Sequence, residues 1–148
     1  MFASPFDHHT PLYVTRWPDT SAIGYDALSL DWYKLGPGLF ACPPWRLISR
    51  VLRKLKDEQR PIDVVLVLPW WEGAPWWSLV EEVIGQCVRV RAGPWVASRV
   101  WPGCKSPAPT VRSDLLVGRV KSSRTSLRIR PRGVWEVQEG VVIERVSV

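Results

Sequence analysis

The pair Pro43-Pro44 constrains the fold of this chain more than any other feature, because it ends a short apolar run abruptly. Neither ring nitrogen can donate a hydrogen bond and each ring fixes φ, so neither a helix nor a strand ladder continues through the pair. The run from Leu39 to Cys42 therefore predicts a buried strand that ends at this corner, with Trp45 directly after it. In α/β proteins a corner between a strand and a helix can hold a flat ring, which makes it the first candidate site.

The segment that follows, residues 45–59, has the periodicity of an amphipathic helix, with apolar residues three and four positions apart. Its other side is basic, with three arginines at i, i+4 and i+7. The basic residues are Arg46, Arg50, Arg53 and Lys54. Such a stripe can follow a phosphate backbone, although a solvated helix face explains a run of charges equally well.

The run Asp63–Leu68 is apolar without alternation, which predicts a central parallel strand that is covered on both faces. Strand, helix and strand in this order give a right-handed βαβ crossover. A second helix is predicted over residues 75–85 and an outer strand over residues 87–91. We therefore expect an α/β fold, a parallel sheet with flanking helices, followed by a Pro- and Gly-rich loop region over residues 92–118. Within the last part of this region, residues 111–120 can contain a short element.

Four tryptophans lie between Pro69 and Trp77, where the second strand is expected to end. Ligands of open α/β sheets bind outside the carboxyl ends of the strands. Trp70 and Trp71 can therefore form a stacking platform for bases beside the corner, or wedge the next helix onto the sheet. Trp76 is expected to pack in the core.

The positive charge of the chain belongs to its C-terminal part. Residues 1–86 carry 8 Lys/Arg against 10 Asp/Glu, whereas residues 87–148 carry 12 against 4. This asymmetry indicates an anionic partner, most often nucleic acid. A basic C-terminal extension, residues 119–148, is expected to end in a β-hairpin around Glu139-Gly140. Its basic residues up to position 132 are Arg119, Lys121, Arg124, Arg128, Arg130 and Arg132.

Cysteine and histidine usage predicts neither a disulfide framework nor a metal site. The three cysteines have no CxxC spacing, and the pair His8-His9 has no further ligand at a useful distance. No apolar run reaches membrane-spanning length, and no signal peptide is evident. We expect an intracellular protein of the nucleus or an organelle, with no membrane partner.

Two carboxylates, Asp26 and Asp31, precede the corner. They can receive ribose or base hydroxyls or act as acid and base, but their spacing favours turn capping.

Several segments, in this order and spacing, resemble the region that follows the RNase H domain in DIRS-type, tyrosine-recombinase retrotransposon polyproteins. That region is itself similar to phage-type Dam DNA adenine-N6 methyltransferases. The resemblance covers residues 2–116. The segments that carry it are Phe2–Phe6, Leu12–Val14, Asp26–Trp32, Cys42–Leu52, Pro69–Trp77 and Asp114–Leu116.

The resemblance implies that Cys42, Pro43, Pro44 and Trp45 occupy the methyltransferase catalytic corner. There an Asn or Asp and a Pro carbonyl accept hydrogen bonds from the target amine, and an aromatic ring stacks on the flipped base. Trp45 keeps the ring, but Cys42 supplies only a weakly accepting thiol. The family's first strand and its acidic residue, which help to form the S-adenosylmethionine pocket, have no counterpart before Met1. The resemblance thus implies a truncated, Rossmann-like methyltransferase-type domain over residues 1–91, with a degenerate corner and no cofactor.

Three functions are compatible with these features. The first is a non-catalytic, retroelement-derived domain that binds DNA or RNA. Its affinity for the nucleic acid should fall steeply as the salt concentration rises. The second is a structural subunit of a large ribonucleoprotein or other assembly, in which aromatic and Arg residues face protein partners. The third, an active adenine-N6 methyltransferase, requires binding of S-adenosylmethionine.

Overall fold

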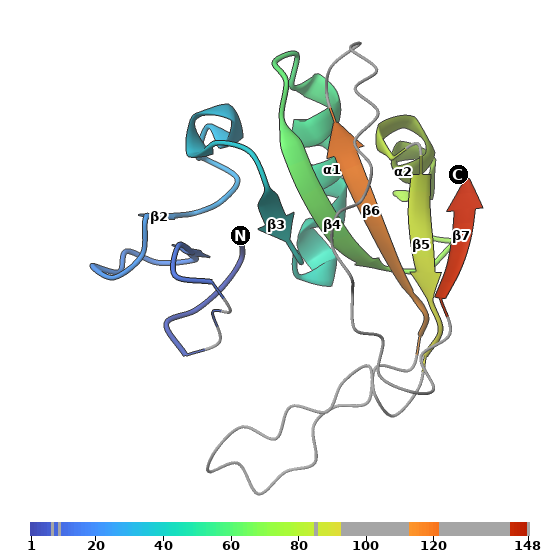
Figure 1. The fold of residues 1–148 in the computed structure, drawn as a ribbon, viewed down its shortest axis with the longest axis horizontal. Helices are drawn as coiled ribbons and strands as arrows, with labels where there is room; N and C mark the ends of the chain where they lie inside the picture. Colours follow the sequence, from blue (N-terminus) through green and yellow to red (C-terminus); the bar gives the residue numbers. More distant parts are fainter. Residues whose placement is uncertain (7, 9, 85, 93–112, 122–142, 148) are drawn as a thin grey trace, which may run out of the picture.

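The computed structural model describes residues 1–6, 8, 10–84, 86–92, 113–121 and 143–147, and it has an α/β fold. A mixed sheet of five strands has the order β3-β4-β6-β5-β7, and two helices cover one of its faces (Figure 1). Together, the elements are β3 (Leu39–Ala41), α1 (Ile48–Asp57), β4 (Asp63–Pro69), α2 (Trp77–Val83), β5 (Gln86–Val90), β6 (Leu115–Lys121) and β7 (Ile143–Ser147).

The predicted strand–helix–strand unit is confirmed. β3 pairs in parallel with β4, with Phe40 opposite Val65, and α1 connects the two strands. Pro43-Pro44 separates β3 from a short 3₁₀ turn over Trp45–Leu47, which leads directly into α1. The Leu47 N–H donates to the Pro44 carbonyl at 2.7 Å, so the chain turns into the helix immediately after the corner.

The prediction of a parallel sheet is wrong beyond the β3–β4 pair. β6 runs antiparallel between β4 and β5, and β7 runs antiparallel along β5. Residues 115–118 were expected in the loop region, but they form the first part of β6, so the predicted end of that region is wrong. Gly118 weakens the strand signal in sequence because glycine has no side chain to pack in a strand. β5 is consequently not an outer strand, since it lies between β6 and β7.

β7 coincides with the position predicted for the second strand of the C-terminal hairpin, and its partner in the described residues is β5. The first strand of the hairpin and the turn at Glu139-Gly140 lie outside the described residues, as do the arginines expected to form the basic extension. These arginines are Arg124, Arg128, Arg130 and Arg132.

The core lies between the sheet and the two helices. Val64, Leu66 and Leu68 alternate along β4 and are buried on the helix side, where Leu52 and Val80 are fully buried. Asp63, Val65 and Val67 alternate with them, point to the opposite face and are half-buried. Cover by helices was expected on both faces, but in the described part of the chain both helices lie on one face (Figure 1).

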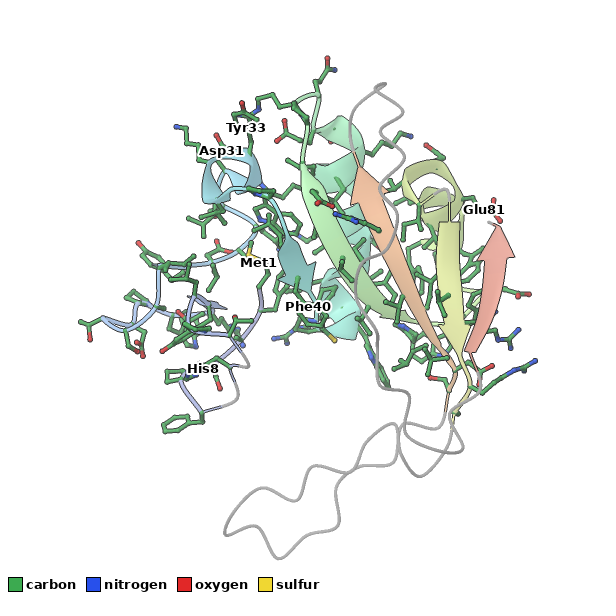
Figure 2. The ribbon with its side chains drawn as sticks, viewed as in Figure 1. Met1, His8, Asp31, Tyr33, Phe40 and Glu81 are labelled. Atoms are coloured by element: carbon green, nitrogen blue, oxygen red, sulfur yellow. The ribbon has the colours of Figure 1, made fainter. Side chains whose placement is uncertain are left out.

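The N-terminal region lies beyond β3, at one edge of the sheet (Figures 1 and 2). It contains a two-stranded parallel sheet, β1 (Val14–Thr15) and β2 (Gly24–Tyr25). The buried ring of Trp32 anchors this region, and its Nε1 donates to the Ala27 carbonyl at 2.6 Å. No helix in the described ranges is long and apolar enough to cross a bilayer.

Candidate nucleic-acid interface

Five tryptophans meet where β3 and β4 end. Trp45 follows the proline corner. Trp70, Trp71 and Trp76 come from the connection between β4 and α2, and Trp77 begins α2. Trp45 lies edge-on to Trp71 with ring centroids 4.7 Å apart, and Trp71 lies 6.5 Å from Trp76. Trp76 is 6.1 Å from Trp77, which lies edge-on to Trp70 at 5.2 Å. We call this continuous series of ring contacts the tryptophan chain.

Burial is greatest in the middle of the tryptophan chain and is least at the corner. Trp76 and Trp77 are buried, which confirms the prediction that Trp76 packs in the core, whereas Trp70 and Trp71 are half-buried. Trp45 is 62% exposed. Because the Trp45 and Trp71 planes are inclined by 73°, Trp71 covers at most one face of the Trp45 ring. The exposed end of the tryptophan chain therefore offers a free aromatic face to solvent.

Three exposed arginines follow the Trp45 ring along the chain. Arg46 lies in the 3₁₀ turn, and Arg50 and Arg53 lie on α1. None of the three forms an ion pair with another described residue. The pKa of Asp26 is lowered mainly by the hydrogen bond from the Ser29 hydroxyl. The positive charge of Arg50 contributes a smaller part of this shift. The predicted basic residues thus begin directly after Trp45 in the chain, and their charges are not neutralised by an ion pair with another described residue.

The corner itself has little hydrogen-bonding capacity for an amine. Desolvation of the sulfur raises the pKa of Cys42, against the weaker effect of the Met1 ammonium, so the group is a neutral thiol near pH 7. A thiol is a weak acceptor. The Pro44 carbonyl already accepts the Leu47 N–H. The Met1 ammonium donates to the Phe40 carbonyl on the outer edge of β3, at 2.7 Å (Figure 2).

Charged side chains hold Trp70, the other end of the tryptophan chain. Trp70 Nε1 donates to Glu72 at 2.8 Å, and the Arg89 guanidinium lies 4.7 Å from the centre of the Trp70 ring. Arg89 in turn donates to Asp114 at 2.7 Å. The sequence reasoning did not find Arg89 or Asp114. The available signal was the alternation of β5, which places Arg89 on the same face as buried Cys87 and so requires a partner for its charge.

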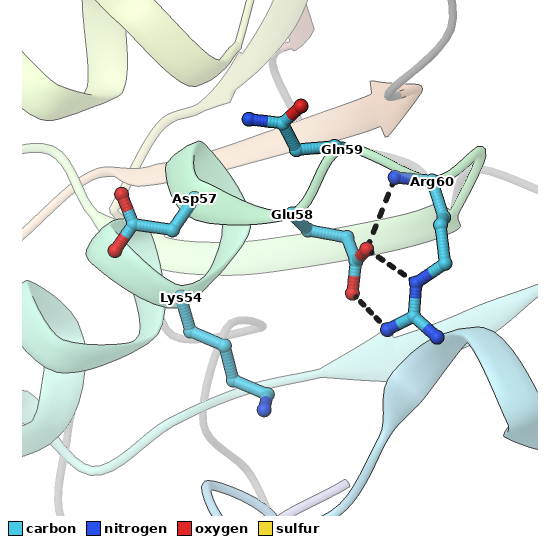
Figure 3. A pocket seen from close by; sticks show the side chains of 5 residues that line it. All are labelled: Lys54, Asp57, Glu58, Gln59 and Arg60. Atoms are coloured by element: carbon cyan, nitrogen blue, oxygen red, sulfur yellow. Dashed lines mark hydrogen bonds and ion pairs between the residues drawn. The ribbon is translucent and has the colours of Figure 1, made fainter.

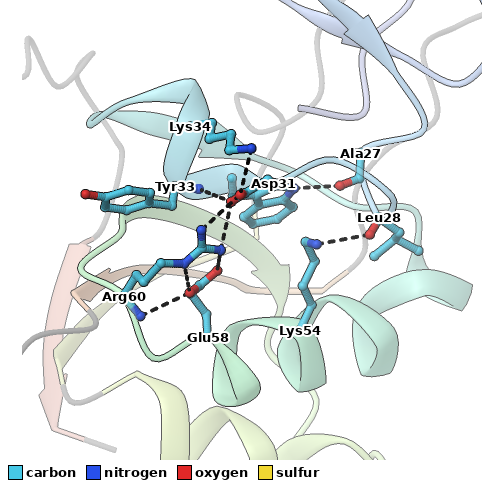
Figure 4. A network of polar contacts seen from close by, with 9 residues as sticks. Ala27, Leu28, Asp31, Tyr33, Lys34, Lys54, Glu58 and Arg60 are labelled. Carbon is cyan, nitrogen blue, oxygen red and sulfur yellow. Dashed lines mark hydrogen bonds and ion pairs between the residues drawn. The ribbon is translucent and has the colours of Figure 1, made fainter.

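The remaining predicted binding residues lie away from the exposed ring. Lys54 is half-buried, and its Nζ donates to the Leu28 carbonyl at 3.0 Å, so it connects α1 to the N-terminal region (Figure 4). Arg119 pairs with Asp63, at the opposite end of β4 from Trp70. The backbone of Lys121 ends β6, and its side chain is outside the described part.

A shallow hollow at the C-terminal end of α1 is lined by residues 54 and 57–60 (Figure 3). Its main charges already have partners. Arg60 binds Glu58 and reaches Asp31 with two further hydrogen bonds of 2.9 Å (Figure 4). Asp31 also caps the 3₁₀ helix at Tyr33, and its bonds to Arg60 lower its pKa. The network ties the N-terminal region to α1, so we place the candidate interface at the tryptophans instead. The carboxylates of Asp26 and Asp31 accept hydrogen bonds from the backbone N–H groups of Leu28 and Tyr33, which is the turn capping that the sequence favours.

No protein-family model, no curated protein and no solved structure matches this chain. The resemblance to the retrotransposon segment therefore stays a prediction based on its motifs. Among the described residues, no three His, Cys, Asp or Glu side chains come together in a way that could hold a metal ion. Asp7 and His9 of the N-terminal segment are not among those residues.

Proposed function

We propose that this chain is a non-catalytic nucleic-acid-binding domain, derived from a retroelement and related to the Rossmann-like adenine-N6 methyltransferases. The observation that carries the proposal is the free face of Trp45 beside Arg46, Arg50 and Arg53. Proteins that bind single-stranded nucleic acids combine exposed aromatic rings, on which bases stack, with positive charge that tracks the phosphates. The exposed end of the tryptophan chain has both components within a few residues.

The corner supports binding without methyl transfer. Transfer to an exocyclic amine needs strong acceptors that hold the amine beside the methyl donor. Cys42 offers a weakly accepting thiol at the position where, by the resemblance, the enzymes have Asn or Asp. The ring at Trp45 can still stack on a base, so the part of the corner that binds is retained while the part that positions the amine is replaced.

The salt dependence of binding tests the proposal. We expect the protein to bind short labelled DNA or RNA oligonucleotides, with an affinity that falls steeply between about 50 and 200 mM salt. Each phosphate contact contributes about 0.7 to 0.9 to the slope of log affinity against log salt. The triple variant Arg46→Gln, Arg50→Gln, Arg53→Gln should therefore have a slope shallower by about 2 to 3. Fluorescence anisotropy measures both quantities.

A matched variant controls for the change in net charge. Arg16, Lys34 and Lys56 are also exposed, but they lie in the N-terminal region, in the 3₁₀ helix after Asp31 and opposite Glu82. Replacing these three by glutamine removes the same charge and should change the slope much less. Absence of binding at low salt would refute the proposed function, and equal slopes for the two triple variants would refute the placement of the interface.

Removal of the exposed ring gives a second, independent test. Trp45→Ala should weaken oligonucleotide binding about 5- to 150-fold, because stacking of a base on an aromatic ring contributes about 1–3 kcal/mol. The thermal unfolding midpoint should change little, since the ring is 62% exposed. Trp17→Ala is the control, because Trp17 is 68% exposed in the N-terminal region. Equal losses of affinity in the two variants would contradict a specific role for Trp45.

A second candidate function is a structural subunit of a larger assembly, such as a ribonucleoprotein. The observation that favours it is a set of large apolar side chains exposed in the N-terminal region, since apolar surface of this kind can mark a protein–protein contact. They are Phe6, Leu12, Trp17, Ile23 and Tyr25. A subunit held in place only by these side chains would be indifferent to the two triple variants, so the salt titration separates the two candidates.

A further inference from the structure

Asp114 collects hydrogen bonds from the ends of two other strands. It directly precedes β6, and its backbone carbonyl accepts the Trp70 N–H, just after β4, at 2.7 Å. Its carboxylate accepts the Ala92 N–H, just after β5, at 2.7 Å, and the Arg89 Nε at 2.7 Å. The side chain is only 16% exposed. One residue therefore joins β4, β5 and β6 at the end of the sheet where the tryptophan chain lies.

The bond to Arg89 determines where a planar cation lies against a ring. The Arg89 guanidinium is 4.7 Å from the centre of the Trp70 ring, and Asp114 accepts a hydrogen bond from its Nε at 2.7 Å. A guanidinium fixed in this way stacks on an aromatic face and favours one orientation of the ring. Trp70 contacts Trp77, and the ring contacts then continue through Trp76 and Trp71 to the exposed end of the chain.

We propose that Asp114 is a positioning residue of the interface. By holding Arg89 against Trp70, it fixes the Trp70 end of the tryptophan chain and thereby the arrangement of rings that presents Trp45 to a base. Asp114 itself does not touch the ligand. The ligand-binding part of this inference rests on the proposed function, whereas the effect on the rings does not.

The direction in which affinity changes when the Asp114 charge is removed distinguishes a positioning role from a purely electrostatic one. The Ala92 N–H and then Arg89 lower the pKa of Asp114, so the residue is a carboxylate at neutral pH. Removing a negative charge from a protein that binds a polyanion should strengthen binding if charge alone matters. Loss of positioning should weaken binding instead.

The experiment compares Asp114→Asn with Asp63→Asn. Both variants neutralise one aspartate of an Asp–Arg pair between neighbouring strands, but the Asp63–Arg119 pair lies at the opposite end of β4 from Trp70. Asparagine can still accept the Ala92 N–H, so the Asp114→Asn protein should fold, which thermal unfolding checks. The two readouts are oligonucleotide affinity and the near-ultraviolet circular dichroism spectrum, which responds to the relative orientation of tryptophan rings.

Asp114→Asn should bind about 2- to 10-fold more weakly, the range that corresponds to one lost aromatic or cation–π contact, and should alter the near-ultraviolet spectrum. Asp63→Asn should keep the spectrum and bind as tightly as the unsubstituted protein, or more tightly. An unchanged spectrum in Asp114→Asn, or equal strengthening of binding in both variants, would overturn the positioning role. If the unsubstituted protein binds no oligonucleotide, the proposed function fails, and the spectra alone still support or overturn the role of Asp114 in fixing the rings.

Discussion

Replacement of Trp32 by alanine is expected to lower the free energy of unfolding by about 3–5 kcal/mol, the usual cost of removing a large buried aromatic side chain. Trp32 is 1% exposed, and its ring contacts Phe2 edge-on at 6.4 Å. Lys54 Nζ lies 6.0 Å from the ring centre, so the ring also faces α1. The Ala27 carbonyl would lose its bond from the indole at the same time. A domain of this size has a total stability of about 5–15 kcal/mol, so much of it would be lost.

Equilibrium unfolding in urea measures this effect. Trp32→Phe, which keeps most of the volume but not the Nε1 donor, should lose less stability than Trp32→Ala. Trp17→Ala removes the same side chain from a site that is 68% exposed, and its unfolding midpoint should stay close to that of the unsubstituted protein. Similar midpoints for Trp32→Ala and Trp17→Ala would show that the N-terminal region does not depend on the buried ring.

The part of the fold that sequence could predict is the part that depends on local signals. Pro43-Pro44 ends a strand because proline has no N–H to donate and a fixed φ. The periodicity of apolar residues in α1 indicates which of its faces is buried. Both signals act within a few residues, so β3, α1 and β4 were found almost at their observed bounds. The same unit also predicts that the corner and the connection after β4 adjoin, which the contact of Trp45 with Trp71 confirms.

The direction of β6 could not be predicted, because it depends on pairing across many residues. A continuous apolar run such as β4 is typical of parallel strands, but it also suits a strand with antiparallel neighbours whose alternate side chains are half-buried. The sequence Leu115–Lys121 contains Gly118 and two basic residues, and its place beside β4 follows from tertiary packing. The loop assignment was wrong for that reason.

In the candidate site, too, the residues that follow from local spacing could be predicted, and those with distant partners could not. The spacing of Arg46, Arg50 and Arg53 on one helix needed only helical geometry, and all three are exposed. Lys54 belonged to the same run of charges, but its partner is the Leu28 carbonyl, 26 residues earlier. A lysine can bury its stem along apolar surface while its ammonium reaches a distant acceptor, and a local pattern does not show this. Asp114 and Arg89 were missed because they are 25 residues apart.

The close packing of Gly118 gives the second large expected effect. Gly118 lies between Leu66 of β4 and Cys87 of β5, on the helix side of the sheet. A Cβ atom at this position would lie 2.5 Å from Ile84 Cγ2 and 3.1 Å from Ile84 Cδ1. Ile84 is fully buried, and its N–H donates to the Val80 carbonyl at 2.8 Å, so it cannot move aside easily. Gly118→Val should therefore lower the free energy of unfolding by about 3 kcal/mol or more.

A compensating change in Ile84 shows whether the clash is the cause. Ile84→Ala alone leaves a cavity and should cost about 2–5 kcal/mol. In the double variant, the valine methyl groups fill part of that cavity, so the combined loss should be smaller than the sum of the single losses by about 0.5–3 kcal/mol. Gly73→Val is the control, because a Cβ at Gly73 meets no atom within 4 Å. Urea unfolding of the four variants measures the interaction. Strictly additive losses, or a Gly118→Val protein as stable as Gly73→Val, would show that Ile84 does not explain why this central strand position is a glycine.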